Sequence, residues 1–125
     1  MNTETPKNPI LKLVAIQKDL KAPKNKFNSF GKYNYRSCED ILEAVKPLCH
    51  AAGVVLTLTD EVVQVGSWVY VKAIASVQDE SGAFSTVAYA REPAERKGMD
   101  ASQITGSASS YARKYALNGL FCIDD

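Results

Sequence analysis

The stretch "SWVYVKAIASVQDESGAFSTVAYAR", Ser67 to Arg91, decides the fold of this chain. β-Branched and aromatic residues fill both of its halves, and the tetrapeptide "DESG", Asp79 to Gly82, separates them. The earlier segment "VVLTLT", Val54 to Thr59, has a similar composition, and Gly66 lies between it and Ser67. This composition, interrupted by turn residues, predicts a three-stranded antiparallel sheet. Its expected strands are Val54–Thr59, Ser67–Val77 and Ala83–Arg91.

Two helices are predicted before the sheet. Asn8 is a suitable cap and Pro9 a suitable first helical residue. The helix that they open should end before Pro23, because the residue preceding a proline disfavours helical backbone angles. Ser37 is followed by acidic residues, a pattern that predicts the start of a second helix, and Gly53 is expected to end it.

A third helix is predicted after the sheet. Asp100 and Gln103 form a capping pair at its start, and Gly119 is the expected C-cap. The resulting order of elements describes one α+β domain over residues 1–125, in which helices pack on a three-stranded antiparallel sheet. Residues 1–7 are polar and are expected to be frayed.

Charge is segregated along the chain, although the net charge is only +1. No acidic residue lies between Asp19 and Glu39, a span that contains five cations: Lys21, Lys24, Lys26, Lys32 and Arg36. A second acid-free run, residues 101–123, contains Arg113 and Lys114. Because runs of one charge attract polyanions, the two basic segments favour contact with nucleic acid. The alternative is that these cations are ordinary solvated surface.

The last helix has two different faces when it is wound at about 100° per residue. One face is expected to pack on the sheet: Ile104, Ala108, Tyr111 and Tyr115. The other is small, hydroxyl-bearing and cationic: Ser102, Thr105, Gly106, Ser109, Arg113 and Ala116, with Lys114 at its flank. Small residues let a phosphate backbone approach closely, and the hydroxyl groups and Arg113 can donate to phosphate oxygens. The alternative is that the small residues only permit tight helix packing.

The sequence carries no signature of an enzyme, a metal site or a membrane span. Cys38, Cys49 and Cys122 lack metal-ligand spacing, and no phosphate-binding loop, carboxylate cluster or nucleophile arrangement is present. No apolar run approaches ~18 residues. We therefore expect a protein without catalytic activity, cofactor or metal and without contact to a membrane. The odd number of cysteines and the absence of a signal peptide favour a reducing, cytoplasmic setting.

Two long motifs resemble the essential recombination function (ERF) family of phage and prophage single-strand annealing proteins. They are "FGKYNYRSCEDILEAVKPL", Phe30 to Leu48, and "GSASSYARKYALNGLFCIDD", Gly106 to Asp125. The resemblance covers about Phe27 to Asp125 and accounts for Pro47, which would otherwise be unexpected inside a helix. Family members usually continue into a variable tail, which suggests that a C-terminal tail is missing.

The resemblance implies a fold and a function. The fold is a β-β-β-α core of the single-strand annealing type. The function is ATP-independent binding of single-stranded DNA and annealing of complementary strands during homologous recombination, by an oligomeric ring. The implied partners are single-stranded DNA, further copies of the chain, and a phage exonuclease or a host single-strand-binding protein in the bacterial cytoplasm.

Charge pattern and resemblance together predict a DNA-binding groove between the acid-free loop and the last helix. Its expected DNA-binding residues are Lys24, Lys26, Lys32, Tyr33, Tyr35, Arg36, Arg91, Arg96, Lys97, Thr105, Ser109, Arg113 and Lys114. Phe27 and Phe30 are expected to anchor the loop on the core rather than to stack on bases. Two alternatives stay open: a double-stranded-RNA-binding-like module with the same α-β-β-β-α order, and a non-catalytic self-associating scaffold.

Overall fold

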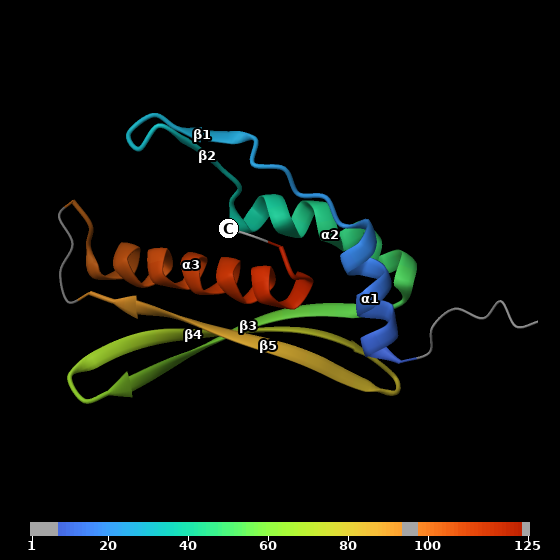
Figure 1. Ribbon diagram of the computed structural model, residues 1–125. Coiled ribbons are helices and arrows are strands. Elements are labelled where there is room, and N and C mark those ends of the chain that lie inside the picture. Colours follow the sequence, from blue (N-terminus) through green and yellow to red (C-terminus); the bar gives the residue numbers. More distant parts are fainter. Residues whose placement is uncertain (1–7, 94–97, 124–125) are drawn as a thin grey trace, which may run out of the picture.

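The computed structural model describes residues 8–93 and 98–123, and Figure 1 shows how they are arranged. Residues 1–7, which we expected to be frayed, lie outside the described residues. The elements follow the predicted order, and the segment around Gly31, for which a loop or a short hairpin is expected, forms a hairpin before the second helix. They are α1 (Pro9–Asp19), β1 (Lys26–Asn28), β2 (Tyr33–Tyr35), α2 (Cys38–Ala52), β3 (Val55–Val65), β4 (Trp68–Asp79), β5 (Gly82–Glu92) and α3 (Ala101–Phe121).

The main sheet has the order β3-β4-β5, and all three helices lie on one of its faces (Figure 1). Its other face is covered by no helix of the described segments. Both strand pairs are antiparallel, so that Ala73 of β4 lies opposite Asp60 of β3 and Ala88 of β5. In the middle of β4, from Val71 to Val77, every second residue points toward the helices and is buried: Val71, Ala73, Ala75 and Val77. The predicted α+β fold with a three-stranded antiparallel sheet is confirmed.

Strand β3 is longer than the sequence pattern indicated. The prediction ended it at Thr59, but it continues to Val65, which pairs with Trp68. Val62 and Val65 are exposed in this extension. Because neither face of the extension is buried, no alternation of apolar and polar residues marks it in the sequence.

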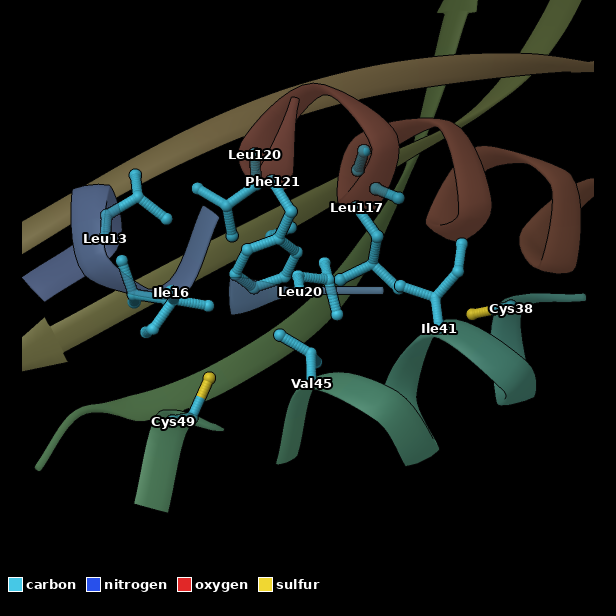
Figure 2. Packing of buried hydrophobic residues seen from close by; sticks show 14 of the residues in the cluster. Leu13, Ile16, Leu20, Cys38, Ile41, Val45, Cys49, Leu117, Leu120 and Phe121 are labelled. Carbon is cyan, nitrogen blue, oxygen red and sulfur yellow. The ribbon is translucent and has the colours of Figure 1, made fainter. Parts of the chain in front are cut away.

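The hydrophobic core lies between the sheet and the three helices. Figure 2 shows the ring of Phe121, in the last turn of α3, among Ile16 of α1, Leu20, and Val45 of α2. Phe121 is 1% exposed, and the neighbouring Leu117 is fully buried. The last turn of α3 therefore packs against α1 and α2 in one hydrophobic cluster that also includes buried residues of the sheet.

The predicted helix starts are confirmed by their capping hydrogen bonds. The side chain of Asn8 accepts from the backbone N–H of Leu11 at 2.8 Å, and Pro9 is the first residue of α1. Ser37 forms a capping box with the third residue of α2, and Asp100 does so at the start of α3. These bonds satisfy N–H groups that have no partner within the helix. Within residues 8–93 and 98–123, no helix is long and apolar enough to span a membrane.

Two expectations about prolines and glycines had different outcomes. Helix α2 runs through Pro47 and ends at Gly53, which has a φ of +75°. The prediction that Gly119 is the C-cap of α3 is wrong, because the helix continues to Phe121 and is capped by Cys122, at a φ of +57°. Leu120 and Phe121 are buried, and this tertiary packing extends the helix past the glycine.

Candidate nucleic-acid interface

A hollow of about 590 Å³ lies between the β1-β2 hairpin and α3. Figure 1 shows the hairpin projecting over the N-terminal half of α3. The lining side chains are mostly aromatic, cationic or able to form hydrogen bonds, and Glu39 is the one carboxylate among the described residues that line it. They are Lys24, Asn28, Tyr33, Asn34, Tyr35, Arg36, Ser37, Cys38, Glu39, Ser107, Ser110, Tyr111, Lys114 and Tyr115.

The hairpin wall of the hollow is fixed by Asn28. Its side-chain oxygen accepts from the backbone N–H groups of Phe30 at 2.9 Å and Gly31 at 3.1 Å, and its amide group donates to the Tyr33 hydroxyl at 3.0 Å. Lys32 follows with a φ of +56°, which reverses the chain. A side chain at Gly31 would collide with the ring of Tyr33. These local contacts hold Tyr33 in the wall of the hollow.

The phenylalanines of this segment do not anchor it, contrary to the prediction. Phe27 is 60% exposed and Phe30 is 100% exposed. The hairpin is held instead by polar contacts to the chain behind it. Arg36 is buried and its guanidinium donates to the carbonyl of Ala22 at 2.8 Å.

Lys26 connects the hairpin to the start of α2. Its ammonium group donates to Asp40 at 2.5 Å and to Ser37 at 3.3 Å. The hydrogen bond between Lys26 and Asp40 raises the pKa of Lys26. The same bond, together with hydrogen bonds from Ser37, lowers the pKa of Asp40. Lys26 therefore points to α2, outside the hollow that Lys24, Tyr33 and the other lining residues share.

The orientation of α3 differs from the one that we predicted. The face on the sheet consists of residues spaced by four: Ile104, Ala108, Ala112, Ala116 and Leu120. The prediction that Tyr111 and Tyr115 pack on the sheet is wrong, since they are 50% and 42% exposed, and Ala116 is fully buried rather than on the outer face. Alanines let the helix lie close to the small residues of β4, where a tyrosine would not fit. The regular spacing of four was the signal that we missed.

The exposed tyrosines form a pair on the surface of α3. Their ring centroids are 6.5 Å apart, and the ring planes differ by only 19°. Both rings line the hollow beside the hairpin, where Tyr33 and Tyr35 form an edge-to-face pair on the opposite wall. The structure thus brings four tyrosines together in one site.

A second hollow, of about 250 Å³, lies on the other side of the tyrosine pair, next to β5. Arg91, Tyr89 and Pro93 line it together with Tyr111 and Tyr115. The guanidinium of Arg91 lies 3.7 Å from the centroid of the Trp68 ring, a cation–π contact. The tyrosine pair is therefore shared by two hollows, each of which contains a cation. Arg96 and Lys97 lie outside the described residues.

The predicted phosphate-binding stripe of α3 faces carboxylates of the sheet. The hydroxyl of Ser109 donates to Asp60 at 2.5 Å, and Arg113 Nε donates to the same carboxylate at 3.0 Å. Thr105 donates to Glu92 at 3.0 Å. The structure does not bring these three residues into the hollow with Lys114, and their contact with nucleic acid stays a prediction.

Comparison with known proteins agrees with the motifs. Residues 11–125 match the sequence model of the ERF superfamily. Over 114 residues, 91% of the chain, it is 59% identical to a protein of Salmonella phage P22 named "Essential recombination function protein". The chain spans about half the length of that relative, 55%. No solved structure matches the chain. The family model covers nearly the whole chain, so the predicted resemblance is confirmed and the chain belongs to the ERF superfamily.

Proposed function

We propose that this chain binds single-stranded DNA and anneals complementary strands during phage recombination. The observation that supports this most is the composition of the hollow between the hairpin and α3. It combines Lys24 and Lys114 with four tyrosines, and cations interleaved with aromatic rings are typical of grooves for single-stranded nucleic acid. The name of the phage P22 relative supports the recombination role.

In the proposed mechanism, phosphates are bound by the cations and hydroxyl groups on the walls of the hollow. Lys24 comes from the segment before the hairpin, whereas Lys114, Ser107 and Ser110 come from α3. A backbone held from both sides is extended, and its bases can then meet a complementary strand. Pairing is itself favourable, so no nucleotide hydrolysis is required. Arg113 does not line the hollow; its ion pair with Asp60 holds α3 on β3 and so supports the wall that α3 forms.

We further propose that copies of the chain assemble into a ring. Strands β3 and β5 are the two edges of the main sheet, and an open edge is a template for pairing with another chain. Helix α1 also exposes an apolar stripe, Ile10, Leu11 and Val14. Two different surfaces that bind each other make a head-to-tail contact, which produces a closed ring when the rotation between copies allows it. Analytical ultracentrifugation would test this, because a monomer at all concentrations would contradict it.

The binding proposal is tested by fluorescence anisotropy with a labelled single strand of about 30 nucleotides across a salt series. Loss of one phosphate contact in Lys114→Ala should make the slope of log K against log salt shallower by about 0.7. Lys18→Ala, an exposed site on α1, is the matched control with the same change in charge. A strand-annealing assay with the same variants follows.

The possible outcomes separate the proposal from its alternatives. Single-strand binding with an effect confined to Lys114→Ala supports it. Equal losses in Lys114→Ala and Lys18→Ala would show that only net charge matters. Preference for duplex RNA would indicate the double-stranded-RNA-binding-like module, and oligomers without nucleic-acid affinity would indicate the scaffold.

A further inference from the structure

We propose that Tyr111 and Tyr115 form a stacking platform for nucleobases, where the bound strand crosses α3 from the hairpin hollow to the β5 hollow. This inference rests on the proposed binding of single-stranded DNA and names the part of the strand that the site contacts. It adds base contacts to a site for which the proposed mechanism names only phosphate contacts.

The first argument is the geometry of the two rings. Tyr111 and Tyr115 are one helical turn apart, so their side chains leave α3 in the same direction. The nearly parallel rings, 19° apart in plane, offer aromatic faces of one orientation. Flat bases stack on such faces whatever their sequence, because every base has a π-face.

The second argument is that the rings are not needed for the core. The alanine stripe of α3 makes the contact with the sheet, and Ala112 and Ala116 are fully buried. Tyr111 and Tyr115 remain about half exposed above it. The two neighbouring rings on the solvent side of the helix form a contiguous apolar surface, and exposed apolar surfaces rimmed by polar residues can mark interaction sites.

The third argument is what lies on each side of the pair. Lys114 lines the hairpin hollow and Arg91 lines the β5 hollow, while both rings line the two hollows. The order cation, aromatic pair, cation matches a strand whose phosphates alternate with bases along the backbone. An apolar peptide would have no use for cations at both ends of the patch.

Stacking at this place is compatible with annealing. A base that stacks on Tyr111 or Tyr115 covers one of its faces, whereas the Watson–Crick edge at its rim can still point away from the protein. The platform would therefore fix the position of one or two bases per subunit and leave their pairing groups accessible. Stacking on the two rings would then contribute to the affinity for single-stranded DNA, and this contribution would depend on the bases and not on the salt concentration.

The test compares two ligands with the same phosphates. One is an oligothymidylate, and the other is an abasic deoxyribose-phosphate chain of equal length. For the double variant Tyr111→Leu/Tyr115→Leu, we expect binding of oligothymidylate on the order of 10- to 100-fold weaker, with an unchanged salt slope. Binding of the abasic chain should not change. The matched control, Tyr111→Phe/Tyr115→Phe, keeps both rings and should bind oligothymidylate like the wild type.

Each outcome is decisive. Wild-type affinity of the leucine variant for oligothymidylate would overturn the platform and leave the proposed function standing. Equal losses for both ligands would also overturn it, since the tyrosines would then act through the fold or the cations. If the wild type bound neither oligothymidylate nor the abasic chain, the proposed function itself would be refuted. Photo-crosslinking of a halogenated-uracil strand adds a direct measurement, in which the platform requires adducts on Tyr111 or Tyr115.

Discussion

Truncating Phe121 should greatly reduce stability, whereas truncating Phe30 should hardly change it. Phe121 is 1% exposed and lies in the middle of the core, whereas Phe30 is 100% exposed at the turn of the hairpin. The substitutions Phe121→Ala and Phe30→Ala remove the same atoms. Removing a buried phenylalanine ring costs about 3–5 kcal/mol, because transfer free energy is lost and a cavity remains. An exposed one should change the free energy of unfolding by less than about 0.5 kcal/mol.

The loss at Phe121 is a large part of the total stability. For 125 residues, the free energy of unfolding is about 6–19 kcal/mol at 0.05–0.15 kcal/mol per residue. With an m-value of about 1.5–2 kcal/mol per molar urea, a loss of 3–5 kcal/mol lowers the unfolding midpoint by about 2–3 M. The Phe30→Ala midpoint should stay within about 0.3 M of the wild type.

Urea titration followed by circular dichroism measures both variants under the same conditions. Equal midpoints for Phe121→Ala and Phe30→Ala would refute the burial that we assign to these residues. A large loss in Phe30→Ala alone would mean that the hairpin packs on the core, as the sequence pattern suggested. The m-value should be the same in all three proteins, since otherwise the midpoints do not compare the same transition.

Three further predictions concern ionisation, thiol reactivity and one hydrogen bond. The ion pair with Lys12 lowers the pKa of Asp79 to about 2, below its unfolded value of about 3.9. Its stabilising contribution is therefore complete above about pH 4 and is lost as the pH falls toward 2, so Asp79→Asn should show a flatter dependence of Tm on pH in this window. Cys38 and Cys49 are buried, and burial raises the pKa of Cys49 to about 11, whereas Cys122 is exposed. Ellman's reagent at pH 8 should therefore modify one thiol in the native protein and all three in denaturant. Thr86→Val removes a hydrogen bond of 2.8 Å to a carbonyl group of α3 and should cost about 1 kcal/mol in urea unfolding.

Features that depend on neighbouring residues were predictable from the sequence. The caps at Asn8, Ser37 and Asp100 follow from side chains that reach the backbone N–H three residues later. Strands β4 and β5 follow from β-branched residues on either side of the Asp79–Gly82 turn. The family followed from two motifs long enough to be specific, and not from composition.

Features that depend on distant parts of the chain were not predictable in this way. The side of α3 that faces the sheet is set by packing against small side chains of β4, such as Ala73 and Ala75. The helix lies close to them, and only small side chains such as alanine fit between. Arg113 meets Asp60, a residue 53 positions away, and so does not line the hollow that Lys114 lines. Charge segregation singled out the loop whose Lys24 and Arg36 line the hollow, but it could not tell which cations share one surface.

The place of Phe121 in α3, which follows all three strands of the main sheet along the chain, has a consequence for protein synthesis. The strands from Val55 to Glu92 are consecutive and can pair as soon as they leave the ribosome. The core that α1 and α2 share with the sheet is completed only by the last turn of α3, whose final residue, Phe121, is translated 29 residues after Glu92. At about 5–20 residues per second, this leaves the unfinished core open for roughly 1.5–6 s. During that interval each nascent chain presents an apolar surface that a chaperone can bind and that a neighbouring nascent chain can misassemble with.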